Sequence, residues 1–194
     1  MCDRGKAKAG DKLQVPKLPE ARLPEAKLPE PWLRGTLKEV PAAQRAVLHA
    51  LEMAEEDLKG WCGNLTSEQI HASPFGLPPV AFHLRHIARS LDRLLTYAEG
   101  RSLTDEQLAA LKAESGPEKG RVDLFSELAS AIGESARRIR AFDVDTLDEV
   151  RRIGRKQLPT TVVGLLVHIA DHTQRHVGQA VTTAKVVVAQ GADL

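Results

Sequence analysis

Five of the seven histidines lie in two short segments of the chain. One segment holds His83 and His86, and the other holds His168, His172 and His176. In the second segment the imidazoles recur every four residues, a spacing that places side chains one turn apart on one face of an α-helix. Imidazole is the commonest protein ligand for transition metals. The two segments therefore predict a metal site built on helices.

A purely structural role is the competing interpretation of any single histidine. A buried neutral imidazole needs partners for both ring nitrogens, and an unpaired one costs about 1–3 kcal/mol. A backbone carbonyl or a carboxylate usually satisfies a lone histidine, and we interpret the isolated His49 and His71 in this way. Two histidines on adjacent turns, with a second pair available opposite, can instead share one cation.

Composition narrows the class of protein. The length of 194 residues suits one domain with a substantial core, and the net charge of +1 gives no overall field toward nucleic acid or an acidic membrane. The chain has Cys2 and Cys62 but no CxxC pair, which argues against disulfide, zinc–thiolate and iron–sulfur frameworks. It shows neither a secretory signal nor an apolar stretch of the ~20 residues that span a bilayer. We therefore expect a cytoplasmic protein with no membrane partner.

The first part of the chain differs from the rest. Three five-residue units at 17–21, 22–26 and 27–31 each carry Leu-Pro-Glu. A proline at every fifth position removes helical hydrogen bonds, so we expect residues 1–31 to form an extended arm. A solvated linker is the simpler interpretation, and an arm that packs its leucines on a partner subunit is the alternative. Residues 32–194 are then the folded domain.

Apolar residues recur at helical spacing in four long segments. The predicted long helices span about 37–61, 79–99, 122–142 and 160–189, with a short connecting helix over 104–114. No segment alternates as a strand should, and 143–157 is expected to be a loop with some local helix. Four such helices bury their apolar faces best as an all-α four-helix bundle. The connection of roughly 20 residues between the second and third helices is long enough for a crossover, which would make those two helices parallel.

A helical wheel locates the histidines relative to the apolar stripes. On the last helix His172 and His176 fall at the centre of the stripe, and His168 lies near its margin. On the second helix His83 borders the stripe, whereas His86 lies further round the flank. The wheel alone therefore favours His83 over His86 as the partner of the last helix.

These segments resemble the DinB-like family of metal-binding four-helix bundles. The resemblance rests on His86-Ile87-Ala88 in the second helix. It rests more specifically on the stretch LVHIADHTQRHVGQ at 166–179, which ends in the pattern HxxxH-x-Gly-Gln. It covers about residues 35–190 and leaves the arm outside.

The resemblance implies that His86, His172 and His176 are the three ligands of a divalent metal ion. It gives His168 no ligand role, and we expect that ring to line the site or to pack above it. It also implies an up-down-down-up bundle, in agreement with the long crossover. The resemblance and the wheel disagree on His83 and His86, which lie about 60° apart on the helix, so a modest rotation decides between them.

Three imidazoles suit Zn, Ni or Fe. Ligands from only two helices leave a position for water or substrate, which is typical of catalytic rather than structural metal. The ion would lower the pKa of bound water towards ~7, or bind the thiolate of a substrate, because some relatives use a low-molecular-weight thiol. We expect a metal-dependent enzyme acting on a small molecule, either a thiol-dependent transferase or a hydrolase, in which Asp171 or Gln179 orients a ligand ring.

Two other classes of function stay open. A non-catalytic stress-response or binding module would hold a structural metal, with His83 or His168 as a fourth ligand. The damage-inducible name of the family suggests nucleic-acid binding, which the basic runs at 137–140 and 151–156 could serve. Interspersed acidic residues and an aromatic content of 4% argue against it, so we expect no nucleic-acid partner. We expect a homodimer, since bundles of this kind often pair through helix faces.

Overall fold

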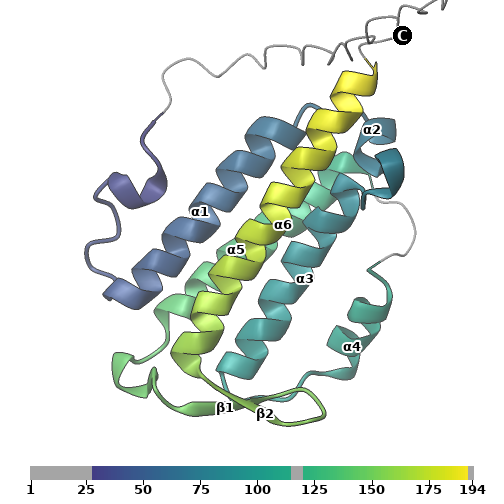
Figure 1. The fold of residues 1–194 in the computed structure, drawn as a ribbon. Coiled ribbons are helices and arrows are strands. Elements are labelled where there is room, and N and C mark those ends of the chain that lie inside the picture. Colours follow the sequence, from purple (N-terminus) through teal and green to yellow (C-terminus); the bar gives the residue numbers. More distant parts are fainter. Residues whose placement is uncertain (1–27, 115–119, 192–194) are drawn as a thin grey trace, which may run out of the picture.

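The computed structural model describes residues 28–114 and 120–191. This part of the chain is mainly helical, as predicted, and holds six α-helices and one two-stranded sheet (Figure 1). The long helices are α1 (Ala42–Cys62), α3 (Val80–Ala98), α5 (Arg121–Arg140) and α6 (Val162–Gly191). The short helices are α2 (Ser67–His71) before α3 and α4 (Asp105–Lys112) after it. Single 3-10 turns, η1 to η3, form at Pro31–Leu33, Pro74–Gly76 and Val144–Thr146.

The four long helices lie side by side and enclose the core (Figure 1). Helix α6 packs along α1 and α3, and α5 packs along α3 and α1. Each helix contributes large aliphatic side chains that are almost fully buried, such as Leu51, Leu84, Leu128 and Leu166. Among the described helices, none combines the length and the hydropathy that crossing a membrane requires.

Local sequence signals fix the starts of both short helices. Thr104 accepts a hydrogen bond from the Gln107 backbone N–H, and the Gln107 side chain accepts one from the Thr104 N–H. This capping box begins α4 where the sequence predicts a helix. Thr66 and Gln69 form the same box at α2, a helix that we did not predict.

The structure corrects the prediction that no strand forms. Within 143–157, η3 is the expected local helix, but β1 (Val150–Ile153) then pairs antiparallel with β2 (Leu158–Thr161). Gly154 and Gln157, with φ of 64° and 49°, turn the chain between the two strands. Both strands are only four residues long, and neither alternates apolar and polar side chains, so the pattern on which the prediction depends is missing.

The hairpin also sets where the last helix begins. The first two N–H groups of α6 donate to the carbonyls of Leu147 and Glu149. The Gly164 N–H donates to the hydroxyl of Thr161 at 3.0 Å, so Thr161 caps the helix. Helix α6 therefore starts two residues later than predicted, and the hairpin anchors the first turn of the helix that carries His168, His172 and His176.

Replacing Thr161 with alanine is expected to lower the free energy of unfolding by about 1 kcal/mol, because the cap on Gly164 is lost. Urea denaturation followed by circular dichroism measures this change. Thr161→Ser is the control, since serine keeps the hydroxyl and should keep most of the stability. Equal stability of Thr161→Ala and the wild type would show that this cap contributes nothing.

Residues 1–27, most of the predicted arm, lie outside the described residues. The chain that follows is fastened to the bundle. The Arg34 guanidinium donates to both carboxylate oxygens of Glu56 on α1, at 2.5 and 2.7 Å, and its Nε donates to the Pro29 carbonyl. The division between an arm and a folded domain at residue 31 stays a prediction.

Candidate metal centre

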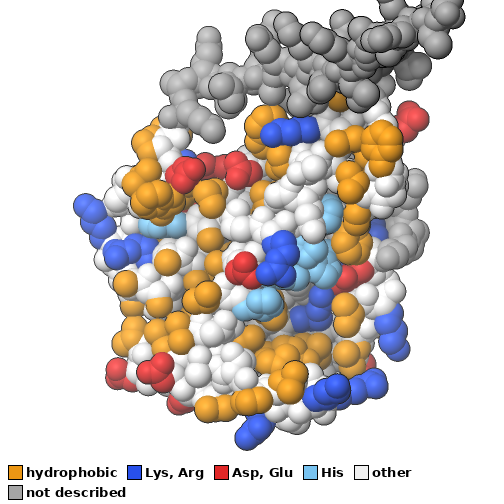
Figure 2. All heavy atoms as spheres, in the orientation of Figure 1, with side chains coloured by type: hydrophobic (Ala, Val, Ile, Leu, Met, Phe, Trp, Pro, Cys, Tyr) orange, Lys and Arg blue, Asp and Glu red, His pale blue; other side chains and the backbone are white. Residues whose placement is uncertain are grey.

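Three histidines from two helices come together on one face of the bundle. His86 of α3 and His172 and His176 of α6, here called the three-histidine group, each place one nitrogen within 4.8 Å of the other two. His86 Nε2 lies 3.0 Å from His172 Nε2. All three side chains are half-buried, and Figure 2 shows histidine side chains gathered at the surface over α3 and α6. The group is therefore within reach of solvent.

The helical wheel placed the rings of His172 and His176 deeper in the core than the structure does. Around the group, the fully buried residues of α6 are Ile169, Thr173 and Val177, whereas His172 and His176 flank them. The predicted stripe was centred on Leu165, whereas the buried face of α6 also includes Leu166, Thr173 and Val177 and is therefore rotated away from the histidines. On α3 the wheel favoured His83, but the structure brings His86 into the group.

His168 and Asp171 stay at the edge of the site. The exposed His168 ring lies one turn before His172, with ring centroids 5.5 Å apart, and is not part of the three-histidine group. Asp171 lies 4.0 Å from His168 Nδ1 and accepts a hydrogen bond from Arg175 at 2.7 Å. This geometry therefore does not favour the predicted role of Asp171, which was to orient a ligand ring.

The sequence analysis assigned no role to Glu114. This residue follows α4, and its carboxylate contacts His86 of the three-histidine group. Its Oε2 lies 2.7 Å from His86 Nδ1, and its Oε1 accepts a hydrogen bond from Arg93 at 2.6 Å. The residue is 7% exposed. A buried carboxylate at Nδ1 holds a proton there and leaves the lone pair of His86 on Nε2, the nitrogen that faces His172. No local spacing signals this contact, because 28 residues separate the partners.

Replacing Glu114 with glutamine is expected to weaken metal binding roughly 10- to 100-fold, because the charge that orients His86 is lost. Competition with a chromophoric chelator measures the dissociation constant for zinc. Glu134→Gln, the same chemical change in an exposed ion pair with Arg137, should leave zinc binding unchanged. An unaltered zinc affinity in Glu114→Gln would contradict the orienting role.

His83 contacts the group from the buried side. Its Nδ1 lies 3.0 Å from His176 Nδ1, and the residue is 1% exposed. Phe82 covers the group on another side, because its ring stacks on His86 with centroids 5.4 Å apart and an interplanar angle of 19°. The rings of His86 and His176 are therefore held by packing as well as by polar contacts.

Burial and neighbouring positive charge favour the neutral form of these imidazoles. Desolvation, followed by the repulsion of neighbouring histidines, lowers the pKa of His83 and of His172 to about 4. Desolvation, then the repulsion of His86 and Arg175, lowers the pKa of His176 to about 4 against the opposing pull of Glu114, and Arg175 also contributes at His172. These rings are neutral at pH 7, which is the form that ligates a metal.

The donor set fits a divalent transition metal. Two nitrogens that are each about 2.0–2.1 Å from one ion lie roughly 3.0–3.4 Å apart at the usual ligand angles. The 3.0 Å between His86 Nε2 and His172 Nε2 falls in this range. If Glu114 holds the His86 proton on Nδ1, the facing nitrogens need a shared proton or a shared cation between them. Imidazole donors are suited to Zn, Ni and Fe.

The fold and this group define a class of mainly helical proteins whose histidines are compatible with metal binding. The sequence model of the DinB superfamily matches residues 50–180, well over half of the chain and the part that holds the three-histidine group. The chain therefore belongs to the DinB superfamily, as its sequence predicted. No curated protein sequence matches it.

Proposed function

We propose that this protein binds one divalent metal ion through His86, His172 and His176 and uses it as an enzyme acting on a small molecule. Thiol-dependent transfer or hydrolysis is the class of reaction that this site suits. The observation that carries the proposal is the grouping of three imidazole nitrogens within 4.8 Å of one another. When bound, the ion would act as a Lewis acid that lowers the pKa of a bound water or thiol.

Residues around the group prepare its rings for this role. Glu114 keeps the proton of His86 on Nδ1 and so presents Nε2. His83 does the same for His176, because a proton on His176 Nδ1 can be donated to His83 Nδ1 and leaves His176 Nε2 as the ligand atom. Both contacts fix the tautomer and the orientation of a ring.

Two features favour an open site over a structural one. The candidate ligand group within the described residues contains neither His83 nor His168, so no fourth protein ligand closes it. The three side chains are also partly exposed, which allows a small molecule to reach them. Burial raises the pKa of the Cys62 thiol to about 12, so a reacting thiolate would come from a substrate and not from Cys62.

Cobalt substitution separates the two kinds of site. Cobalt(II) bound by this group should give visible absorption bands, and 2-mercaptoethanol should change them and add a thiolate-to-cobalt charge-transfer band. A structural metal with a closed sphere predicts bands that do not respond to the thiol. His172→Ala is the control that should bind cobalt poorly. Absence of stoichiometric cobalt binding in the wild-type protein would overturn the metal site itself.

The architecture that goes with this proposal is the up-down-down-up four-helix bundle, with the segment that carries α4 as the crossover. The packing of α3 against both α5 and α6 supports it. A cytoplasmic homodimer with neither nucleic-acid nor membrane partners completes the proposal. Against nucleic-acid binding, Arg138 of the basic run is 8% exposed and pairs with Asp92 and Glu99.

A further inference from the structure

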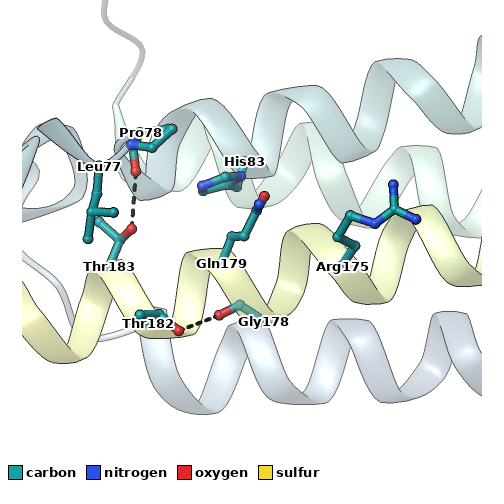
Figure 3. Close-up of a pocket in the computed structure, with 8 residues that line it drawn as sticks. All are labelled: Leu77, Pro78, His83, Arg175, Gly178, Gln179, Thr182 and Thr183. Atoms are coloured by element: carbon teal, nitrogen blue, oxygen red, sulfur yellow. Dashed lines mark hydrogen bonds between the residues drawn. The ribbon is translucent and has the colours of Figure 1, made fainter.

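Two cavities lie along α3, and only one of them adjoins the three-histidine group. The first, of about 300 Å³, lies beside His83 and Gln179 and belongs to the site already described (Figure 3). The second, of about 600 Å³, is enclosed by the last turn of α3, the chain that leads into α4 and the β1–β2 hairpin, at the lower end of the bundle in Figure 1. Its wall includes Tyr97, which lies eleven residues beyond His86 or roughly 16 Å along the helix. The second cavity, here called the hairpin cavity, is therefore separate from the metal centre.

Arg151 fastens the hairpin to the end of α3. Its Nε donates to the Ala98 carbonyl at 2.8 Å, and its Nη2 donates to Glu149 Oε2 at 2.9 Å. Gly100, with a φ of 75°, turns the chain at this point, and a Cβ built on it would lie 3.6 Å from Arg151 Nε. The wall of the hairpin cavity is thus held by specific contacts, and the charge of Arg151 is already balanced by Glu149.

Two further arginines of the hairpin line the cavity without an acidic partner. Arg152 and Arg155 are exposed, and neither forms an ion pair with a carboxylate of the described residues. Arg152 Nη1 lies 3.4 Å from the Gln157 carbonyl, a long contact that leaves its other nitrogens for a ligand. Arg101 also lines the cavity but is held by Glu99. No aspartate or glutamate is among the lining residues, so two unbalanced positive charges face this space.

The rest of the wall combines hydroxyl groups with an apolar surface. The hydroxyls of Tyr97 and Ser102 make no hydrogen bond with any described residue, so both are able to donate to a ligand. Leu103, Leu108 and Val150 supply the apolar surface, and the last two are 40% and 60% exposed. This lining suits a molecule with an anionic group at one end and an apolar body at the other.

A phosphate monoester matches this set of donors. Near pH 7 it carries a charge of about −1.5 to −2, which two unpaired guanidinium groups balance, and its three oxygens accept several hydrogen bonds. The planar fork of arginine fits phosphate oxygens in pairs. A volume of about 600 Å³ is within the range of sites for small molecules.

We propose that the hairpin cavity binds a small organic phosphate, a monoester with an apolar or aromatic body. Arg152 and Arg155 bind the phosphate, Tyr97 and Ser102 donate further hydrogen bonds to it, and the aliphatic side chains contact the body. The basic run at 151–156 then serves a small ligand and not a nucleic acid. This proposal does not depend on the metal site.

Phenyl phosphate and its diester, methyl phenyl phosphate, are the probes, used at physiological ionic strength to screen nonspecific attraction. Tyr97 is the single tyrosine of the chain, so ¹³C-labelled tyrosine gives NMR signals from this cavity alone. Phenyl phosphate should shift these signals in a saturable manner. The diester carries one negative charge and should bind about tenfold more weakly. Unshifted signals overturn the proposal, and so does equal binding of the two esters, which would point to a nucleic-acid backbone instead.

Replacing both unpaired arginines tests the location. The double variant Arg152→Gln, Arg155→Gln should weaken phenyl phosphate binding at least about tenfold, and it should fold because both side chains are exposed. The matched control is Arg137→Gln, Arg140→Gln, which removes the same charge from exposed positions of α5 outside the cavity. Its affinity for phenyl phosphate should equal that of the wild type. Equal affinities in the two double variants overturn the location.

A zinc ion also attracts phosphate, so the metal centre is the competing location. The double variant His172→Ala, His176→Ala lacks two proposed metal ligands and should bind phenyl phosphate as tightly as the wild type. Loss of phenyl phosphate binding in that variant overturns the hairpin cavity as the site. Zinc affinity measured in the same proteins reports the metal site separately, so either proposal can fail while the other stands.

Discussion

Replacing His172 and His176 together with alanine will abolish stoichiometric binding of a divalent metal ion. Zinc sites with four protein ligands bind with about 10–16 kcal/mol, or roughly 2.5–4 kcal/mol for each ligand. Losing two of the three imidazoles should therefore weaken binding by roughly 10⁴- to 10⁶-fold. Elemental analysis of protein without a histidine tag, with chelator competition for zinc, measures the loss.

His168→Ala is the matched control on the same helix. The His168 ring lies one turn before His172 but is exposed and outside the three-histidine group, so its loss should leave zinc binding almost unchanged. Zinc at 100 times its dissociation constant should also stabilise the wild type and His168→Ala by about 2.7 kcal/mol, and the double variant not at all. A double variant that still binds one zinc ion tightly would refute the proposed ligands.

Predicting the long helices from the sequence succeeded because their signals are local. Apolar spacing and flanking breakers located the ends of α1, α3, α5 and α6 to within two residues, except that α1 begins after Pro41, five residues later than predicted. Thr104 capped the short helix because a side chain and an N–H three residues apart meet by local geometry alone. The hairpin was missed for the opposite reason. Pairing between 150–153 and 158–161 depends on the partner strand, and neither strand shows the pattern by itself.

The candidate metal site likewise contains residues that local sequence patterns predict and residues that depend on tertiary packing. The spacing of His172 and His176 follows from one helix, so the sequence placed both on one face. The choice between His83 and His86 depends on how α3 is rotated against α6, which is set by the packing of the whole core. The contact between Glu114 and His86 could not be predicted from local sequence, because it depends on the path of the segment between α3 and α5.

The depth of the rings also depends on packing. Thr173 is more deeply buried than either neighbouring histidine of the group, although a hydropathy pattern ranks threonine as an indifferent core residue. A small side chain at that position allows α6 to pack closely and leaves the imidazoles at the flank. Their partial exposure, which a wheel cannot show, is what makes a substrate-accessible site possible.

Arg138→Ala is expected to lower the free energy of unfolding by about 2 kcal/mol, less than the ~3–5 kcal/mol cost of breaking a fully buried ion pair. The Arg138 side chain is 7% exposed, and its Nη1 donates to Asp92 Oδ1 at 2.7 Å. Its Nε and Nη2 donate to the two carboxylate oxygens of Glu99 at 2.7 and 2.9 Å. The guanidinium therefore links α5 to α3 and to the residue that ends α3. The Asp92 side chain is exposed and that of Glu99 is partly exposed, so water screens both pairs and the cost stays below that of a fully buried pair.

Two variants separate the charge of Arg138 from its packing. Arg138→Met keeps an unbranched apolar side chain, so its loss of stability relative to the wild type reports mainly the ion pairs. Arg137→Ala breaks an exposed pair with Glu134 and should leave the free energy of unfolding almost unchanged. Urea denaturation of all three variants gives the comparison, and an Arg138→Ala protein as stable as Arg137→Ala would rule out the proposed link.

The pH dependence of Arg138→Met gives an independent check on the Glu99 contact. Burial raises the pKa of Glu99, but hydrogen bonds from Arg138 and Arg101 outweigh it and hold the pKa below its ordinary 4.5. A carboxyl whose pKa is lowered by folding contributes stability that is present above pH 4.5 and is lost as the pH falls through the folded pKa. The wild type should therefore exceed Arg138→Met in stability at pH 7, and the difference should shrink as the pH falls well below 4.5. A difference that stays constant over this range would mean that Arg138 stabilises the bundle by packing rather than by its charge.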